Sequence, residues 1–182
     1  YTFGFYRELT PSLLRLCAIL AGVDPPRERE FNYCELGFGQ GGTLGVLASA
    51  NPGSYFCGTD FNSDHLLTAR RLSESAQLSN LSLYDDDFER FRKRVLPAFD
   101  YLVLHGIYSW INDETRAHVR AFLRSYVKPG GLVYLSYNSM PGWSAPMALR
   151  DFIYEHANEH VPRSLSAYAR MDDALAHLNT LK

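Results

Sequence analysis

Residues 35–42 read E-L-G-F-G-Q-G-G, and this stretch decides the fold of the chain. It follows an apolar run at residues 31–34 and precedes a helix-like segment at residues 42–50. A strand that turns sharply into a helix points several backbone N–H groups at one place, and glycines let a ligand approach that backbone closely. The stretch therefore predicts a strand, a tight turn and a helix that together bind a nucleotide.

On both sides of this turn, the chain alternates short apolar runs with helical patterns. The clearest helical pattern lies in residues 113–127, where apolar side chains recur at helical spacing. Strands are predicted at residues 31–36, 54–59, 81–84, 99–104 and 132–137, and helices at residues 11–20, 42–50, 63–77, 88–94 and 113–127. This alternation predicts an α/β, Rossmann-like, doubly wound fold, with a mainly parallel sheet and helices on both faces.

Only helical patterns follow Trp143, near residues 146–158 and 164–182. We expect one nucleotide-binding domain over residues 1–160, with a boundary near Pro162. Residues 161–182 are then a helical tail that begins a following region, since the chain reads as a piece of a longer protein.

Composition excludes several classes of function. The chain has 182 residues, 46% of them hydrophobic, and a net charge of −2, which gives no sign of a nucleic-acid surface. The basic cluster at residues 90–94 fits a solvated helix face, and no apolar run approaches membrane-spanning length. Cys17, Cys34 and Cys57 show no metal or redox spacing, so we expect free thiols and a cytoplasmic location.

Acidic residues follow three of the predicted strands. In a doubly wound sheet the ligand sits beyond the carboxyl ends of the strands. Asp60 comes about 20 residues after the glycine turn, the spacing at which a carboxylate reaches ribose hydroxyls. Asp87 could face the adenine amino group, with Phe61 and Phe88 beside the ring. Glu35 beneath the turn suits a nucleotide with a cationic amino-acid tail and repels a pyrophosphate, so S-adenosylmethionine is favoured and NAD is the rival.

Four further segments carry a resemblance to a known family: G-T-D-F-N at residues 58–62, F-D-Y-L-V-L-H-G-I-Y-S-W at 99–110, K-P-G-G-L-V-Y-L-S-Y-N at 128–138 and M-P-G-W at 140–143. With the glycine turn, they resemble bacterial class I S-adenosylmethionine-dependent methyltransferases. More narrowly, they are similar to the methyltransferases with a C-terminal methyltransferase regulatory region, some of which are protein-lysine methyltransferases. The resemblance implies an enzyme that converts S-adenosylmethionine to S-adenosylhomocysteine and methylates a protein side-chain amine.

The residues above and this resemblance together give a set of cofactor-binding positions. They are Tyr6, Glu35, Gly37, Gly39, Gly41, Asp60, Phe61, Asp87, Phe88 and His105. The Y-x-x-x-x-P motif of the family matches Tyr6 and Pro11, and we expect this segment to fold over the methionine end of the cofactor. The chain departs from the family at residues 38–40, where a smaller turn is usual.

Methyl transfer to an amine needs an unprotonated nucleophile, because a lysine amine carries a proton at neutral pH. His105 is the first candidate for accepting that proton, and Tyr108 and Tyr137 are the second. His105 could equally be structural, with its backbone holding the amino group of the donor. Tyr108, Trp110, Tyr137 and Trp143 lie in the loops expected above the site and favour a mouth for the acceptor.

Residues 156–160 read H-A-N-E-H and match a zinc-binding pattern. No third ligand accompanies them, so a solvated helix end is favoured and no metal is expected. Two alternatives to protein methylation stay open, a small-molecule acceptor and a module that binds the cofactor without catalysis. The sequence leaves the oligomeric state open, including a homodimer.

Overall fold

β1 (Asn32–Leu36) occupies the centre of a parallel five-stranded sheet in the computed structural model, which describes residues 4–26 and 29–180. The strand order is β3-β2-β1-β4-β5. The other strands are β2 (Tyr55–Thr59), β3 (Leu81–Tyr84), β4 (Phe99–Leu104) and β5 (Val127–Leu135). The expected Rossmann-like fold is confirmed.

The strand order reverses its direction between β1 and β4. Cys34 pairs with Leu102 and Glu35 with Val103, so the carboxyl ends of these two central strands lie level with each other. Connections leave β1 and β4 toward opposite sides, and a crevice opens between them. The glycine turn after β1 and His105 after β4 therefore flank one crevice.

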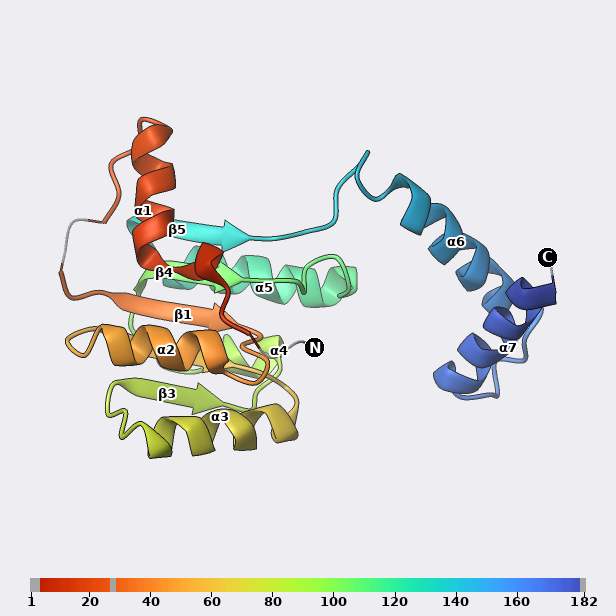
Figure 1. Cartoon of the computed structure of the whole chain (residues 1–182), viewed down its shortest axis with the longest axis horizontal. Helices are drawn as coiled ribbons and strands as arrows, with labels where there is room; N and C mark the ends of the chain where they lie inside the picture. Colours follow the sequence, from red (N-terminus) through yellow and green to blue (C-terminus); the bar gives the residue numbers. More distant parts are fainter. Residues whose placement is uncertain (1–3, 27–28, 181–182) are drawn as a thin grey trace. The chain divides into compact units, whose positions relative to one another are not determined.

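Side chains that alternate along the strands pack into two separate cores, one on each face of the sheet. Tyr33, Phe56 and Tyr101 pack with buried residues of α2 and α3, whereas Cys34, Cys57 and Leu102 pack with those of α4 and α5. Figure 1 shows the same arrangement, with α2 and α3 in front of the sheet and α5 behind it. Both faces of β1 and β4 are covered, which explains why these strands are apolar apart from Asn32, Glu35 and Asp100.

The helices agree with the capping signals in the sequence. The chain opens with η1 (Arg7–Leu9), and the Thr10 side chain then accepts a hydrogen bond from the Leu13 backbone at the start of α1. Asn62, Asp87 and Asn112 cap the helices that follow β2, β3 and β4 in the same way. The bounds are α1 (Pro11–Leu20), α2 (Gly42–Ala50), α3 (Ser63–Ser75), α4 (Phe88–Phe91) and α5 (Asp113–Tyr126).

Several boundaries differ from the sequence expectation, among them the helix expected over 88–94, which ends at Phe91. The helix expected over 63–77 ends at Ser75, because Gln77 adopts a left-handed φ of 51°. The strand expected over 132–137 begins earlier and ends earlier, at Val127 and Leu135. Val127 already pairs with Phe99, and the register then shifts so that Leu132 pairs with Tyr101. Residues 128–131 therefore form an irregular stretch within β5, and residue 137 lies beyond the strand.

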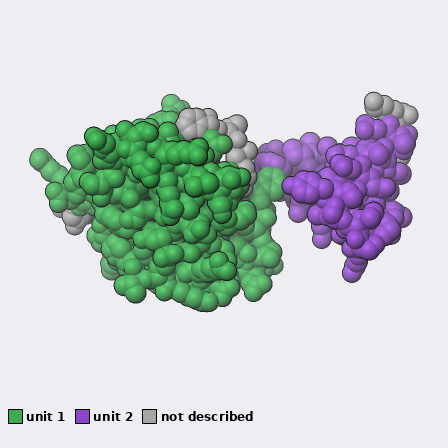
Figure 2. Space-filling view, turned by 90° about the horizontal axis from the view of Figure 1, so that it is seen from below, with its two compact units in different colours: residues 1–137 green, residues 138–182 purple. Residues whose placement is uncertain are grey.

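The chain divides into two compact units, residues 1–137 and 138–182, coloured separately in Figure 2. The second unit contains α6 (Ser144–Glu159) and α7 (Ala167–Thr180), and its last two residues lie outside the described ranges. The division falls earlier than the boundary expected near Pro162, because α6 pairs with α7. Arg170 of α7 donates to the Ala157 carbonyl and to the Asn158 side chain.

Through the described residues, every helix is too short or too polar to cross a membrane. Three thiols, those of Cys17, Cys34 and Cys57, are free, and Cys34 faces Cys57 in register on adjacent strands.

Candidate active site

The turn between β1 and α2 is built on left-handed glycines. Gly37, Gly39 and Gly41 have φ values of 77°, 58° and 76°, which L side chains rarely adopt. At Gly37 a Cβ atom would also lie 1.8 Å from the Ile107 side chain. The Gly37 N–H donates to the Thr59 carbonyl (2.7 Å), which ties the turn to the end of β2. The sequence departure at residues 38–40 is thus compatible with a tight turn.

Phe38 is a bulky residue within this tight turn, and its side chain is buried. Its side chain is 6% exposed and belongs to the core on the α2 side, although it also borders the pocket above. A Cβ atom on Gly58 of β2 would stand 2.9 Å from the Phe38 ring and 2.8 Å from Leu44. Because residue 58 is glycine and has no side chain, the Phe38 ring can pack beneath the turn.

The N-terminal segment is fixed beside the turn. The Tyr6 N–H donates to the Thr43 hydroxyl (3.0 Å), which in turn donates to the Gly4 carbonyl (3.2 Å). The Tyr33 hydroxyl, buried under the segment, donates to the Leu9 carbonyl (3.0 Å). Tyr6 thus lies next to the glycine turn and lines the same pocket.

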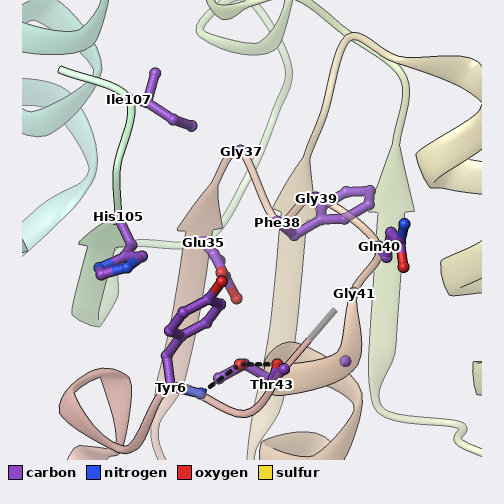
Figure 3. A pocket seen from close by; sticks show the side chains of 12 residues that line it. Tyr6, Glu35, Gly37, Phe38, Gly39, Gln40, Gly41, Thr43, His105 and Ile107 are labelled. Atoms are coloured by element: carbon purple, nitrogen blue, oxygen red, sulfur yellow. Dashed lines mark hydrogen bonds between the residues drawn. The ribbon is translucent and has the colours of Figure 1, made fainter. Parts of the chain in front are cut away.

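Two hollows open at the carboxyl ends of the strands, and Gly37 and Ile107 border both. We call the first the Glu35 pocket. It has a volume of about 530 Å³ and is lined by Gly4, Tyr6, Glu35, Gly37, Phe38, Gly39, Gln40, Gly41, Gly42, Thr43, His105 and Ile107. In the view of Figure 3, Glu35 lies between His105 and the glycine turn.

The second hollow, the Asp60 pocket, has a volume of about 960 Å³. Its lining is Gly37, Asp60, Phe61, Asp86, Asp87, Phe88, Gly106, Ile107, Trp110, Ile111 and Thr115. The four adenosine-side residues expected from the sequence, Asp60, Phe61, Asp87 and Phe88, therefore meet around one hollow. Ile107, Ile111 and Thr115 were not expected there, because none of them is a glycine, an acid or an aromatic residue at the end of a predicted strand.

Glu35 is the least satisfied polar group of the site. Its side chain is 4% exposed, and its Oε2 atom has no hydrogen-bond partner among the described residues. Burial, and then repulsion by Asp60, raise the pKa of Glu35 from 4.5 to about 8. A cationic group placed in the pocket would favour the ionised form and satisfy the free oxygen, since buried acids are normally paired.

Asp60 is equally buried, at 5% exposed, but both of its oxygens have protein partners. Oδ2 accepts from the Gly39 N–H (2.8 Å), and Oδ1 accepts from the Asn62 N–H (3.0 Å). His65 Nδ1 lies 3.2 Å from Oδ1. Asp60 therefore fixes the glycine turn as well as bordering the adenosine-side hollow. The sequence offered no argument for His65. It lies beside Asp60 because it belongs to the first turn of α3.

Asp86 and Asp87, which follow β3, have different partners. Asp86 is 8% exposed and pairs with Arg94, whose guanidinium also lies 4.4 Å above the Tyr84 ring. Asp87 caps α4 by accepting from the Arg90 N–H (2.8 Å), and its side chain stays 54% exposed. The ion pair with Arg94 holds the Asp86 end of this loop, so that Asp87 borders the hollow. Arg94 and Lys93 of the expected basic face are thus paired with acids, the latter with Glu89.

His105 stands at the edge of the Glu35 pocket between two aromatic rings. The ring centroids of Tyr6 and Tyr134 lie 4.6 Å and 6.0 Å from its own. Nδ1 is 3.4 Å from both the Tyr134 and Ser136 hydroxyl oxygens, and Nε2 is 4.0 Å from Glu8 Oε1. Sequence reasoning did not find Glu8 and Tyr134, because each lies within a family segment (residues 6–11 and 128–138) without a chemical signal of its own, and only the fold brings both to His105.

The other candidates for the proton acceptor lie elsewhere. Tyr108 packs with the core on the α5 side, and the Arg116 guanidinium lies 5.4 Å from its ring centroid. Tyr137 is the last residue of the first unit and is 63% exposed. Neither is among the residues that line the two pockets. Of the expected mouth aromatics, Trp110 borders the Asp60 pocket, whereas Trp143 belongs to the second unit.

The H-A-N-E-H segment lies on α6. His156 Nε2 is 3.2 Å from Asp173 of α7, and the His156 ring stacks on His177 at 4.1 Å. Within the part of the chain that is described, no group of three or more His, Cys, Asp or Glu side chains is arranged to hold a metal.

An unpaired buried acid under a glycine turn accepts a ligand with a cationic tail and disfavours a pyrophosphate. This places the chain among the Rossmann-like proteins that bind S-adenosylmethionine rather than a dinucleotide. Residues 34–133, more than half of the chain, match the profile of the family described as "Methyltransferase domain". The chain belongs to this family, and it is a class I methyltransferase domain that uses S-adenosylmethionine.

Relatives of the chain are longer proteins. An uncharacterized protein of Synechocystis sp. is 42% identical over 176 residues, which cover 96% of this chain and 34% of the relative. An uncharacterized protein of Rickettsia prowazekii is 30% identical over 152 residues, 81% of this chain and 58% of the relative. The chain thus spans about a third of the first relative and somewhat over half of the second.

Among solved structures, PKMT2 from Rickettsia typhi is similar over the whole chain. In its complex with AdoHcy it gives a TM-score of 0.77 at 24% identity, covering 100% of this chain and 35% of that one. A second structure of PKMT2 gives a TM-score of 0.77 at 25% identity, covering 97% of this chain and 37% of that one. The confirmed fold extends through the N-terminal helix and the C-terminal helices.

Proposed function

We propose that the protein transfers a methyl group from S-adenosylmethionine to a lysine side-chain amine of a protein. The unpaired, buried Glu35 carboxyl carries the donor half of this proposal, because it calls for a cation in a pocket that adjoins the Asp60 pocket. The sequence resemblance to protein-lysine methyltransferases and the structural likeness to PKMT2 of Rickettsia typhi support the acceptor half.

Different residues would bind the different parts of S-adenosylmethionine. Glu35 would hold the ammonium group of the methionine tail, while the Gly37–Gly41 turn lets the tail pass close to the backbone. Asp60 would accept from a ribose hydroxyl with the lone pairs that Gly39 and Asn62 leave free. Asp87, Phe61 and Phe88 would contact the adenine. Gly37 joins the two hollows, so it lies where the two halves of the cofactor meet.

When bound, the cofactor would supply an electrophilic methyl carbon on a sulfonium sulfur, with the sulfur as the leaving group that would keep the C–S electron pair. The chain itself contributes position, exclusion of water and removal of one proton from the acceptor ammonium. His105 is the proposed proton acceptor, since it borders the Glu35 pocket. Tyr108 and Tyr137, the other candidates, would need to turn toward the site.

We further propose that the protein acts in the cytoplasm and belongs to the group with a C-terminal methyltransferase regulatory region. The domain expected over residues 1–160 would then carry the chemistry, and the helical tail expected over residues 161–182 would lead into that region. Free, adjacent thiols of Cys34 and Cys57 support a reducing compartment.

A labelled-donor experiment tests the function. Full-length protein is incubated with methyl-labelled S-adenosylmethionine and host lysate, and the products are separated by size and hydrolysed to amino acids. We expect label in protein, recovered as methyl-lysine. Label that runs with small solutes would replace the proposal by small-molecule methylation. Tight donor binding without any transfer would indicate a binding module.

A further inference from the structure

Beside the Glu35 pocket, four side chains from three separate segments meet. Glu8 comes from η1, His105 follows β4, Tyr134 lies on β5, and Tyr6 precedes η1. His105 and Glu8 are partly exposed, at 28% and 38%, so a ligand can reach both. No motif in the sequence connects these residues.

The distance between Glu8 and His105 indicates what could bind there. His105 Nε2 and Glu8 Oε1 are 4.0 Å apart, which is too far for a direct hydrogen bond. Two acceptor atoms at this separation can each lie about 2.9 Å from a single nitrogen placed between them. An ammonium group has three N–H donors and a positive charge, so it can bond to both atoms at once.

The second nitrogen of His105 has the partners that this arrangement requires. For Nε2 to accept, Nδ1 must carry the hydrogen. The hydroxyl oxygens of Tyr134 and Ser136 both lie 3.4 Å from Nδ1 and can accept from it. Ser136 Oγ already accepts from the Gly106 N–H (2.7 Å), which holds this hydroxyl in place.

The groups around Glu8 and His105 favour the binding of a cation. The ring of Tyr6 lies against His105, with Tyr134 on the same imidazole, and aromatic faces attract ammonium groups. Burial raises the pKa of Tyr134, and the negative charge of Glu8 raises it further. The Tyr134 phenol therefore stays neutral near pH 7, and the Glu8 carboxylate supplies the negative charge of the cluster.

We propose that Glu8 Oε1 and His105 Nε2 form the subsite for the acceptor, and that this subsite takes a primary ammonium such as the lysine side chain. Glu8 binds the ammonium, and His105 Nε2 receives one of its protons. The imidazolium so formed is paired with the Glu8 carboxylate and returns the proton to water. This inference deepens the proposed function and rests on it.

Binding measurements test the subsite without relying on turnover. Full-length protein saturated with S-adenosylhomocysteine is titrated with Nα-acetyl-lysine methylamide by NMR, with the Nζ-acetylated compound as a neutral control. We expect the amine to bind wild type, and Glu8→Gln to weaken it about tenfold, because the charge-assisted bond is lost while the side-chain shape is kept. Glu8→Asp should recover part of the affinity.

The matched control is Glu74→Gln, which removes the same charge from an exposed site on α3. It should leave amine binding unchanged. Affinity for S-adenosylhomocysteine, measured by calorimetry, should stay within about twofold in Glu8→Gln. With the protein substrate, the same variant should raise KM more than it lowers kcat.

Three outcomes overturn the subsite. Equal binding of the amine by wild type and Glu8→Gln does so, as does failure of wild type to bind it. A loss of S-adenosylhomocysteine affinity with unchanged amine binding would assign Glu8 to the donor instead. If wild type still methylates lysine in the labelled-donor experiment, only the subsite is overturned; if it methylates no amine, the proposed function is overturned as well.

Discussion

Glu35 and Asp60 are two buried acids at the same edge of the sheet, yet their surroundings are opposite. Glu35 ends β1 with a free oxygen, and its pKa is raised to about 8. Asp60 follows β2 and accepts from two backbone N–H groups, with His65 beside it. The comparison teaches that burial alone does not define a ligand contact. The satisfied acid holds the glycine turn in place, and the unsatisfied one is the acid that we propose contacts the ligand.

The largest expected effect is on the pH dependence of stability. Burial raises the pKa of Glu35 in the folded protein, so the folded state binds this proton more tightly than the unfolded chain, whose value is near 4.5. The stabilising effect of the proton is complete below pH 4.5 and is lost as pH rises toward 8. Without cofactor, the free energy of unfolding of wild type, relative to Glu35→Gln, should fall by about 1.4 kcal/mol per pH unit between pH 5 and 8.

Urea unfolding of both proteins at several pH values measures this difference. A constant difference from pH 5 to 8 would show that Glu35 is ionised throughout, and would remove the contrast with Asp60.

Asp60 should matter most for folding. Asp60→Ala leaves the N–H groups of Gly39 and Asn62 without their acceptor, and we expect the free energy of unfolding to fall by about 3 kcal/mol. Asp60→Asn, which keeps one acceptor oxygen, should lose less. Asp64→Ala on exposed α3 serves as the control. Denaturant midpoints of the cofactor-free proteins report the effect, and unchanged stability in Asp60→Ala would assign Asp60 to the ligand alone.

Glu35 should matter most for the donor. Glu35→Gln removes the charge that would face the ammonium of the methionine tail, so affinity for S-adenosylmethionine should fall about 30-fold at pH 8. Calorimetry measures this, with Glu74→Gln as the exposed control. Wild-type affinity in the variant would mean that the cation of the cofactor binds elsewhere.

The smallest effect is expected at Tyr108. Its ring packs on the α5 side beside Arg116, so Tyr108→Phe should leave kcat within about twofold of wild type. Steady-state rates with labelled donor test this. A large loss of kcat with unchanged donor affinity would restore Tyr108 as a proton acceptor and weaken the role given to His105.

Much of the candidate site could be located from the sequence, because its residues lie in short segments with local signals. The glycines at 37, 39 and 41 and the acids Glu35, Asp60 and Asp87 each belong to one turn or one strand end. The order of strands and helices then puts their carboxyl ends at one edge. Local periodicity gave no information on the irregular pairing of β5, which depends on contact with Phe99.

The chain by itself determined the parallel α/β fold, the position of the glycine turn and the acids beside it, since hydrophobic period, capping and left-handed glycines are properties of short segments. The tertiary structure alone decided that Asp60 is satisfied while Glu35 is not, that Glu8 and Tyr134 join His105, and that Tyr108 faces away. Hydrogen bonding and burial depend on partners distant in sequence, and only packing brings those partners together.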